Sequence, residues 1–142
     1  MTPRQRRRRL NALSKEHTIY LITGPQDCAL EPCGSFQWMM APEFGVVAVS
    51  HDPASSDEAY LVALHEIGHG VVQRRGKKMA VLAEEAAAWR WAVENAGFEL
   101  EPHHWAWLVR VLRNDLDNYA TEHFELMKEA EEKSNGRTRA SE

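Results

Sequence analysis

Residues 55–73 read SSDEAYLVALHEIGHGVVQ, and their pattern predicts one long helix. Ser55 and Glu58 have the spacing of a capping box, and Asp57 stands in the first turn, where the helix dipole favours an anion. Two arginines and a glycine follow at 74–76, as is typical where a helix ends. We therefore expect the helix to run from about residue 55 to about residue 73.

Within this helix, His65, Glu66 and His69 form the pattern H-E-x-x-H. Residues four apart lie one turn apart on the same helix face, so both imidazoles can face a single metal ion. Zinc accepts imidazole nitrogens, and a catalytic zinc site keeps one position open for water. Glu66 can reach that water and take a proton from it. The motif predicts one Zn²⁺ ion, with His65 and His69 as ligands and Glu66 as the catalytic base.

A third ligand must come from outside the motif, because no histidine follows within the next dozen residues. The alanine-rich stretch 80–96 predicts a second helix, which a short turn would bring back beside the first. Glu85 shares a face of that helix with Leu82 and Trp89, and a carboxylate on an apolar face is costly unless it is paired or metal-bound. Glu85 is the predicted third ligand, and Glu84 is the alternative.

The remaining segments predict an α+β fold, in which a short sheet of two or three strands packs on the two motif helices. Runs rich in β-branched and aromatic residues predict strands at 18–23 and 45–50, with a short one around 36–40. Prolines open a basic N-terminal helix or arm over 1–16 and a C-terminal helix over about 103–120 or longer. We expect a single domain over 1–142 whose last residues, 134–142, form a frayed tail.

Composition limits the partners. The chain has 142 residues, of which 44% are hydrophobic, and a net charge of −4, so it can bury a core and is not a nucleic-acid binder by bulk charge. No apolar run is long enough for a membrane helix or a secretory signal. Two cysteines do not make a disulfide scaffold, and C-x4-C without a second pair excludes a zinc ribbon, so we expect a cytoplasmic protein. The only candidates for contact with nucleic acid are Arg4, Arg6, Arg7, Arg8 and Arg9.

H-E-x-x-H followed by a glutamate on the next helix resembles the glutamate-type zincins, of which thermolysin is the familiar member. The chain is most similar to the ImmA/IrrE-like metallopeptidases of phages, mobile elements and bacteria. The resemblance rests on GVVAV at 45–49, HEIGH at 65–69 and EAAAW at 85–89, and it covers about residues 17–96. It implies an intracellular zinc peptidase that cuts a repressor-type regulatory protein. Any DNA-binding domain would belong to a partner, because no helix-turn-helix is visible in this chain.

Peptidases of this type usually bind a substrate strand along a sheet edge, and we expect 45–50 to provide that edge. A donor to the reacting carbonyl oxygen is also needed. Four side chains beyond the motif helices could supply it: His103, His104, Tyr119 and His123. Two other readings stay open, namely a zincin-fold module that binds a protein or nucleic acid without catalysis, and a metal-free helical interaction domain. Glu66 favours catalysis over the binding module, because a purely structural metal site does not need this carboxylate.

Overall fold

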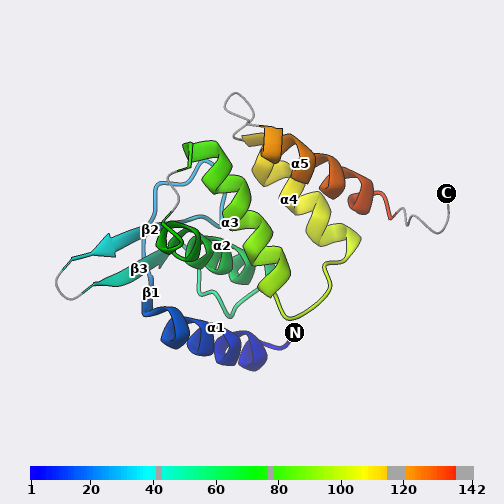
Figure 1. The fold of residues 1–142 in the computed structure, drawn as a ribbon. Helices are drawn as coiled ribbons and strands as arrows, with labels where there is room; N and C mark the ends of the chain where they lie inside the picture. Colours follow the sequence, from blue (N-terminus) through cyan, green and yellow to red (C-terminus); the bar gives the residue numbers. More distant parts are fainter. Residues whose placement is uncertain (41–42, 77–78, 115–120, 137–142) are drawn as a thin grey trace.

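The computed structural model of this chain describes residues 1–142 except 41–42, 77–78, 115–120 and 137–142. The described residues form five helices and a three-stranded sheet (Figure 1), which confirms the predicted α+β class. In chain order the elements are α1 (Pro3–His17), β1 (Ile19–Thr23), β2 (Gly34–Met39), β3 (Phe44–Val49), α2 (Asp57–Arg74), α3 (Val81–Asn95), α4 (Pro102–Asn114) and α5 (Thr121–Ser134).

The sheet has the strand order β1-β3-β2, with β1 parallel and β2 antiparallel to β3. Val47 in β3 stands opposite Leu21 on one side and Phe36 on the other. The expectation that 45–50 form a sheet edge is therefore wrong, because both sides of β3 are already hydrogen-bonded. The outer edges of the described sheet belong to β1 and β2.

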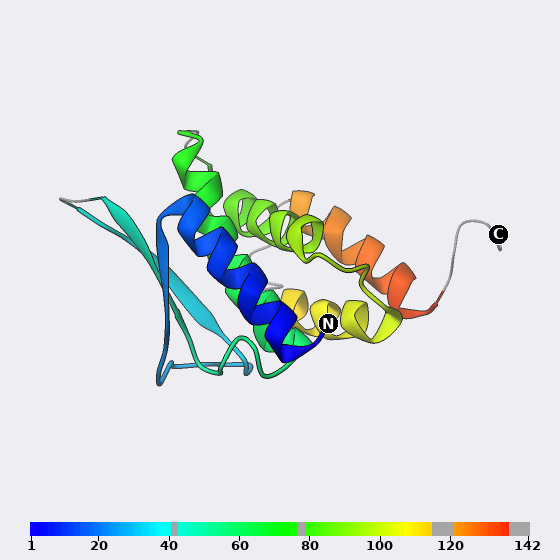
Figure 2. The same cartoon turned by 90° about the horizontal axis from the view of Figure 1, so that it is seen from below.

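The helices all lie on one side of the sheet, and α2 is the layer next to it (Figure 2). Every second residue of β3 is buried, and these residues include Val47 and Val49. α2 packs on β2 and β3 with one face and on α3 with another, and α5 packs against α3 and α4. Because α2 is enclosed in this way, polar side chains in its middle must lie inside the protein.

α2 begins one residue later than the capping-box pattern predicts. Ser56, not Ser55, is the cap: its backbone is extended at φ −155°, and its hydroxyl accepts a hydrogen bond from the Ala59 N–H at 3.1 Å. The Ser55 hydroxyl instead donates to the Asp52 carbonyl. The cap must directly precede the first helical residue, Asp57, for its oxygen to reach an unpaired N–H.

The C-terminal part also differs from the expected single helix over 103–120. α4 ends at Asn114 and a separate helix, α5, begins at Thr121 and packs back on α4. α5 ends at Ser134, and most of the predicted tail lies outside the described residues. None of the described helices combines the length and apolar composition that crossing a membrane requires.

Cys28 and Cys33 form a disulfide in the connection from β1 to β2, with their Cα atoms 5.8 Å apart. This pairing differs from the reduced thiols that a reducing compartment implies. Sulfurs bonded to each other are not available as thiolate ligands, which agrees with the exclusion of a zinc ribbon.

Candidate metal centre

α2 places His65, Glu66 and His69 in the interior, next to one another. The Nε2 atoms of His65 and His69 are 3.2 Å apart, as the i, i+4 spacing of the motif predicts. His65 and Glu66 are buried, and the His69 side chain is 13% exposed. Two imidazole nitrogens therefore point at one shared position.

α3 brings a carboxylate to the same position. One oxygen of Glu85 lies 2.7 Å from His65 Nε2, and the other lies 2.9 Å from His69 Nε2. The two helices can approach closely because Gly68 faces Ala88: a Cβ at Gly68 would lie 2.7 Å from the Ala88 carbonyl oxygen. The small residue between the two motif histidines thus allows the carboxylate to reach them.

Glu84, the alternative ligand, contacts His69 on the opposite side of its ring. His69 Nδ1 donates to Glu84 Oε2 at 2.8 Å, and Gln73 Nε2 donates to the same oxygen at 3.1 Å. The structure therefore separates the two acids that the sequence left open. Glu85 is the one at both Nε2 atoms.

His65 is held by an aromatic contact instead. Its ring stacks on Trp89, with the centroids 3.9 Å apart and the planes 17° apart. Its Nδ1 is buried and has no hydrogen-bond partner among the described residues. The sequence indicated that Trp89 shares a helix face with Glu85, but it did not indicate the stack on His65. The side chain of Leu82, the third residue of that face, lies outside the described part.

Glu66 lies beside the two imidazoles. Its Oε1 is 3.7 Å from His65 Nε2, and a Cβ at Gly34, the first residue of β2, would lie 3.0 Å from Glu66 Cγ. Burial raises the pKa of Glu66 above its usual 4.5, although the neighbouring imidazoles partly offset this. A buried carboxylate with a raised pKa, next to the candidate centre, has the properties of a general base.

His69 and Glu85 shift each other's pKa. Burial alone would lower the pKa of His69, but the hydrogen bond with Glu85 and its charge raise it to about 9. Burial likewise opposes ionisation of Glu85, yet the charge of His65 and the hydrogen bonds from both histidines lower the pKa of this carboxyl below its usual 4.5. These shifts favour a protonated His69 imidazole beside an ionised Glu85 carboxylate.

The donor set fits a divalent ion. The ligand atoms of His65, His69 and Glu85 all lie within 4.8 Å of one another. A tetrahedral zinc with bonds of about 2.0–2.1 Å would separate its ligand atoms by about 3.3–3.4 Å. The observed Nε2–Nε2 distance of 3.2 Å is close to this value, whereas the distances from Nε2 to the Glu85 oxygens, 2.7 and 2.9 Å, are shorter because these groups hydrogen-bond directly. Two histidines and one carboxylate also match the donor types of a catalytic zinc site.

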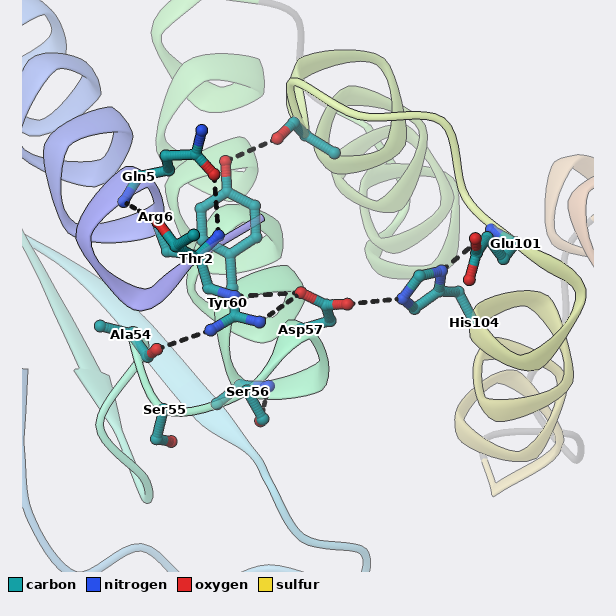
Figure 3. Close-up of polar contacts among 12 residues, drawn as sticks. Thr2, Gln5, Arg6, Ala54, Ser55, Ser56, Asp57, Tyr60, Glu101 and His104 are labelled. Carbon is teal, nitrogen blue, oxygen red and sulfur yellow. Dashed lines mark hydrogen bonds and ion pairs between the residues drawn. The ribbon is translucent and has the colours of Figure 1, made fainter.

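A second polar cluster joins α1, α2 and α4 (Figure 3). The Arg6 Nε and Nη2 atoms donate to Asp57 Oδ1 at 3.0 and 2.7 Å, and its Nη1 donates to the Ala54 carbonyl at 2.9 Å. His104 Nε2 donates to the other oxygen, Asp57 Oδ2, at 2.8 Å, and its Nδ1 accepts from the Glu101 N–H at 2.9 Å. Although burial opposes it, the hydrogen bonds from His104 and Arg6 lower the pKa of Asp57.

Asp57, His103 and His104 lie close enough together for a metal ion, but they do not fit one. His104 Nδ1 accepts from the Glu101 N–H, so its Nε2 is the nitrogen that carries hydrogen, and the Asp57 carboxylate is neutralised by Arg6. The cluster therefore ties helices together. The sequence did not indicate this role, because residues 6, 57 and 104 have no pattern in common.

The predicted oxyanion donors are not part of the described metal centre. His104 is bonded to Asp57, which lies eight residues before His65 and so about 12 Å away along α2. His103 is exposed and lies 3.4 Å from Glu101. Tyr119 and the side chain of His123 lie outside the described residues.

The arginines proposed for nucleic acid fall into two groups. Arg6 is buried against Asp57, and Arg9 is partly buried, with its Nε 3.4 Å from the Asn95 carbonyl, so neither faces a partner. Arg4, Arg7 and Arg8 are exposed on α1. The basic block is therefore partly structural.

The structure brings together the four residues that the sequence analysis singled out: His65, Glu66, His69 and Glu85. Sequence reasoning did not foresee that Glu84 would bind His69 Nδ1 or that Trp89 would stack on His65, because both contacts depend on how α3 packs against α2. Comparison of the chain with known proteins found no matching family model, no matching curated protein and no matching solved structure.

Proposed function

We propose that this chain is a zinc-dependent peptidase, similar to the ImmA/IrrE-like enzymes, that hydrolyses a peptide bond in a protein substrate. The observation that carries the proposal is the convergence of three side chains on one position. His65 Nε2 and His69 Nε2 lie 3.2 Å apart, and each lies within 2.9 Å of a Glu85 oxygen. These three residues would hold the metal ion.

The chemistry divides between the ion and Glu66. When bound, zinc acts as a Lewis acid that lowers the pKa of water and polarises a carbonyl. Glu66 would take the proton from the attacking water and deliver it to the leaving amine. Its burial beside the histidines supports this role, because a carboxyl with a raised pKa is a better proton acceptor in a near-neutral cell. A site used only to stabilise the fold has no need of this residue.

The sheet supports a protein substrate. β2 is an outer strand, and its first residue, Gly34, lies against Glu66. An extended peptide that adds to the outer edge of β2 by main-chain hydrogen bonds would pass beside the proposed base. β2 thus takes the role that the sequence analysis assigned to residues 45–50. The resemblance to repressor-cutting enzymes favours a regulatory protein as the substrate.

Zinc content and hydrolysis test the proposal together. Wild type, Glu66→Gln, His69→Ala and His103→Ala are purified, and their zinc content is measured by elemental analysis. Each protein is then incubated with a bacterial protein extract, and new peptide amino termini are identified by mass spectrometry. The histidine at 103 is exposed and serves as the matched control. We expect one zinc per chain in all but His69→Ala, and new termini only with wild type and His103→Ala.

Two results would overturn this proposal. A wild type that binds no zinc at micromolar concentrations removes the metal centre altogether. A wild type that binds zinc but yields the same termini as Glu66→Gln removes the hydrolytic function and leaves a zinc-bound module that binds its partner.

A further inference from the structure

The two candidate zinc ligands on α2 are held in different ways. His69 Nδ1 donates to Glu84 Oε2 at 2.8 Å, whereas the Nδ1 of His65 is buried and has no hydrogen-bond partner in the part of the chain that the structure describes. The ring of His65 stacks on Trp89, and its Nε2 lies 2.7 Å from Glu85 Oε1. Among the described residues, both imidazoles contact Glu85 through Nε2, but only the ring of His69 is also held by a carboxylate at Nδ1.

The adjacent acids of α3 reach His69 from two sides. Consecutive helix positions differ by about 100°, so neighbouring side chains point in different directions. Glu85 Oε2 lies 2.9 Å from His69 Nε2, and Glu84 Oε2 lies 2.8 Å from the Nδ1 of the same ring. The two nitrogens of the His69 ring therefore contact the carboxylates of two consecutive residues, Glu84 and Glu85.

Gln73 holds the Glu84 carboxylate in turn. It lies four residues after His69, one turn further along α2, and its amide donates to the Glu84 Oε2 atom at 3.1 Å. The Glu84 side chain is 24% exposed, so without these two donors it could extend into water. Two side chains of α2, His69 and Gln73, therefore hold the Glu84 carboxylate in place.

We propose that Glu84 is a positioning residue for the metal centre: it fixes the ring of His69 with Nε2 facing the ion. This inference rests on the proposed zinc function and adds the residue that orients one ligand. A carboxylate can only accept, so Nδ1 must carry hydrogen and Nε2 is the atom left to bind metal. The negative charge of the partner also makes the imidazole a stronger ligand.

The test measures zinc binding, not catalysis. The zinc Kd of wild type and variants is determined by competition with a chromogenic chelator at neutral pH. Glu84→Ala should weaken zinc binding by about 10–100-fold, which is typical for loss of a residue that orients a ligand. Glu84→Gln should recover part of this loss, because its amide oxygen still accepts from Nδ1. Glu94→Ala is the matched control, since Glu94 is an exposed acid on the same helix, and it should bind zinc as wild type does.

A second measurement separates orientation from general weakening of the fold. In the cobalt-substituted proteins, the visible absorption of Co²⁺ reports the geometry around the ion. Glu84→Ala should change this spectrum, and Glu84→Gln should restore it toward wild type. The inference is overturned if Glu84→Ala has the same zinc Kd as Glu94→Ala, or if the glutamine variant is no better than the alanine variant. Failure of wild type to bind zinc at all would instead overturn the proposed function.

Discussion

Replacement of Asp57 by alanine should destabilise the protein by about 3–4 kcal/mol. The change removes three hydrogen bonds to one carboxylate, two from Arg6 and one from His104. Bonds to charged groups contribute about 1.5–3 kcal/mol each, but the Asp57 side chain is 24% exposed, so we take about 1 kcal/mol for each. Loss of an acid from the first turn of α2 adds about 0.3–1 kcal/mol.

Urea unfolding followed by circular dichroism measures this loss. Glu58→Ala is the matched control, because Glu58 stands in the same first turn of α2. It should cost only the helix-dipole contribution of about 0.3–1 kcal/mol. A double-mutant cycle of Asp57→Ala with Arg6→Met isolates the coupling between the two side chains. Equal losses in Asp57→Ala and Glu58→Ala would refute the reasoning, since the three bonds would then contribute nothing.

The contribution of Asp57 to the free energy of unfolding depends on pH. The pKa of Asp57 is lower in the folded protein than its usual 3.8, so the ionised carboxylate is the form that stabilises the fold. The difference in stability between wild type and Asp57→Ala should be complete above pH 3.8. It should disappear as the pH falls through the lower pKa of the folded state.

Two further predictions concern the metal centre. Contacts with Glu85 and Glu84 raise the pKa of His69 to about 9, so zinc must displace a proton from this imidazole. The zinc affinity should therefore rise with pH up to about 9. A zinc Kd that does not change with pH would contradict this. Gly68→Ala should force α2 and α3 apart, because the new Cβ would lie 2.7 Å from the Ala88 carbonyl oxygen. Overpacking of this kind destabilises the fold by about 1–3 kcal/mol, and the higher helix propensity of alanine offsets roughly 1 kcal/mol of this. The separation of the two helices should also weaken zinc binding. Gly24→Ala is the control, because a Cβ at Gly24 has no atom within 4 Å. Equal melting temperatures and equal zinc Kd values for the two variants would argue against the close approach of α2 to α3 at Gly68.

Several features of this protein followed from local sequence, because they depend on interactions within one or two helical turns. The 3.6-residue period puts His65 and His69 on one face, and the structure has their Nε2 atoms 3.2 Å apart. Pro3 opens α1, as the sequence predicts, and Thr2 caps this helix. The three strands also lie where β-branched and aromatic residues gather.

Tertiary packing decided the features that join distant segments. The sequence favoured Glu85 over Glu84, but only the approach of α3 to α2 determines which carboxylate meets Nε2 and which meets Nδ1. Strand order depends on which backbones hydrogen-bond, and local propensity does not report this. The sequence therefore predicts an edge strand at 45–50, whereas β3 is the central strand. The bonds of Asp57 to Arg6 and His104 join residues 51 and 47 positions apart, a separation at which no periodic pattern carries information.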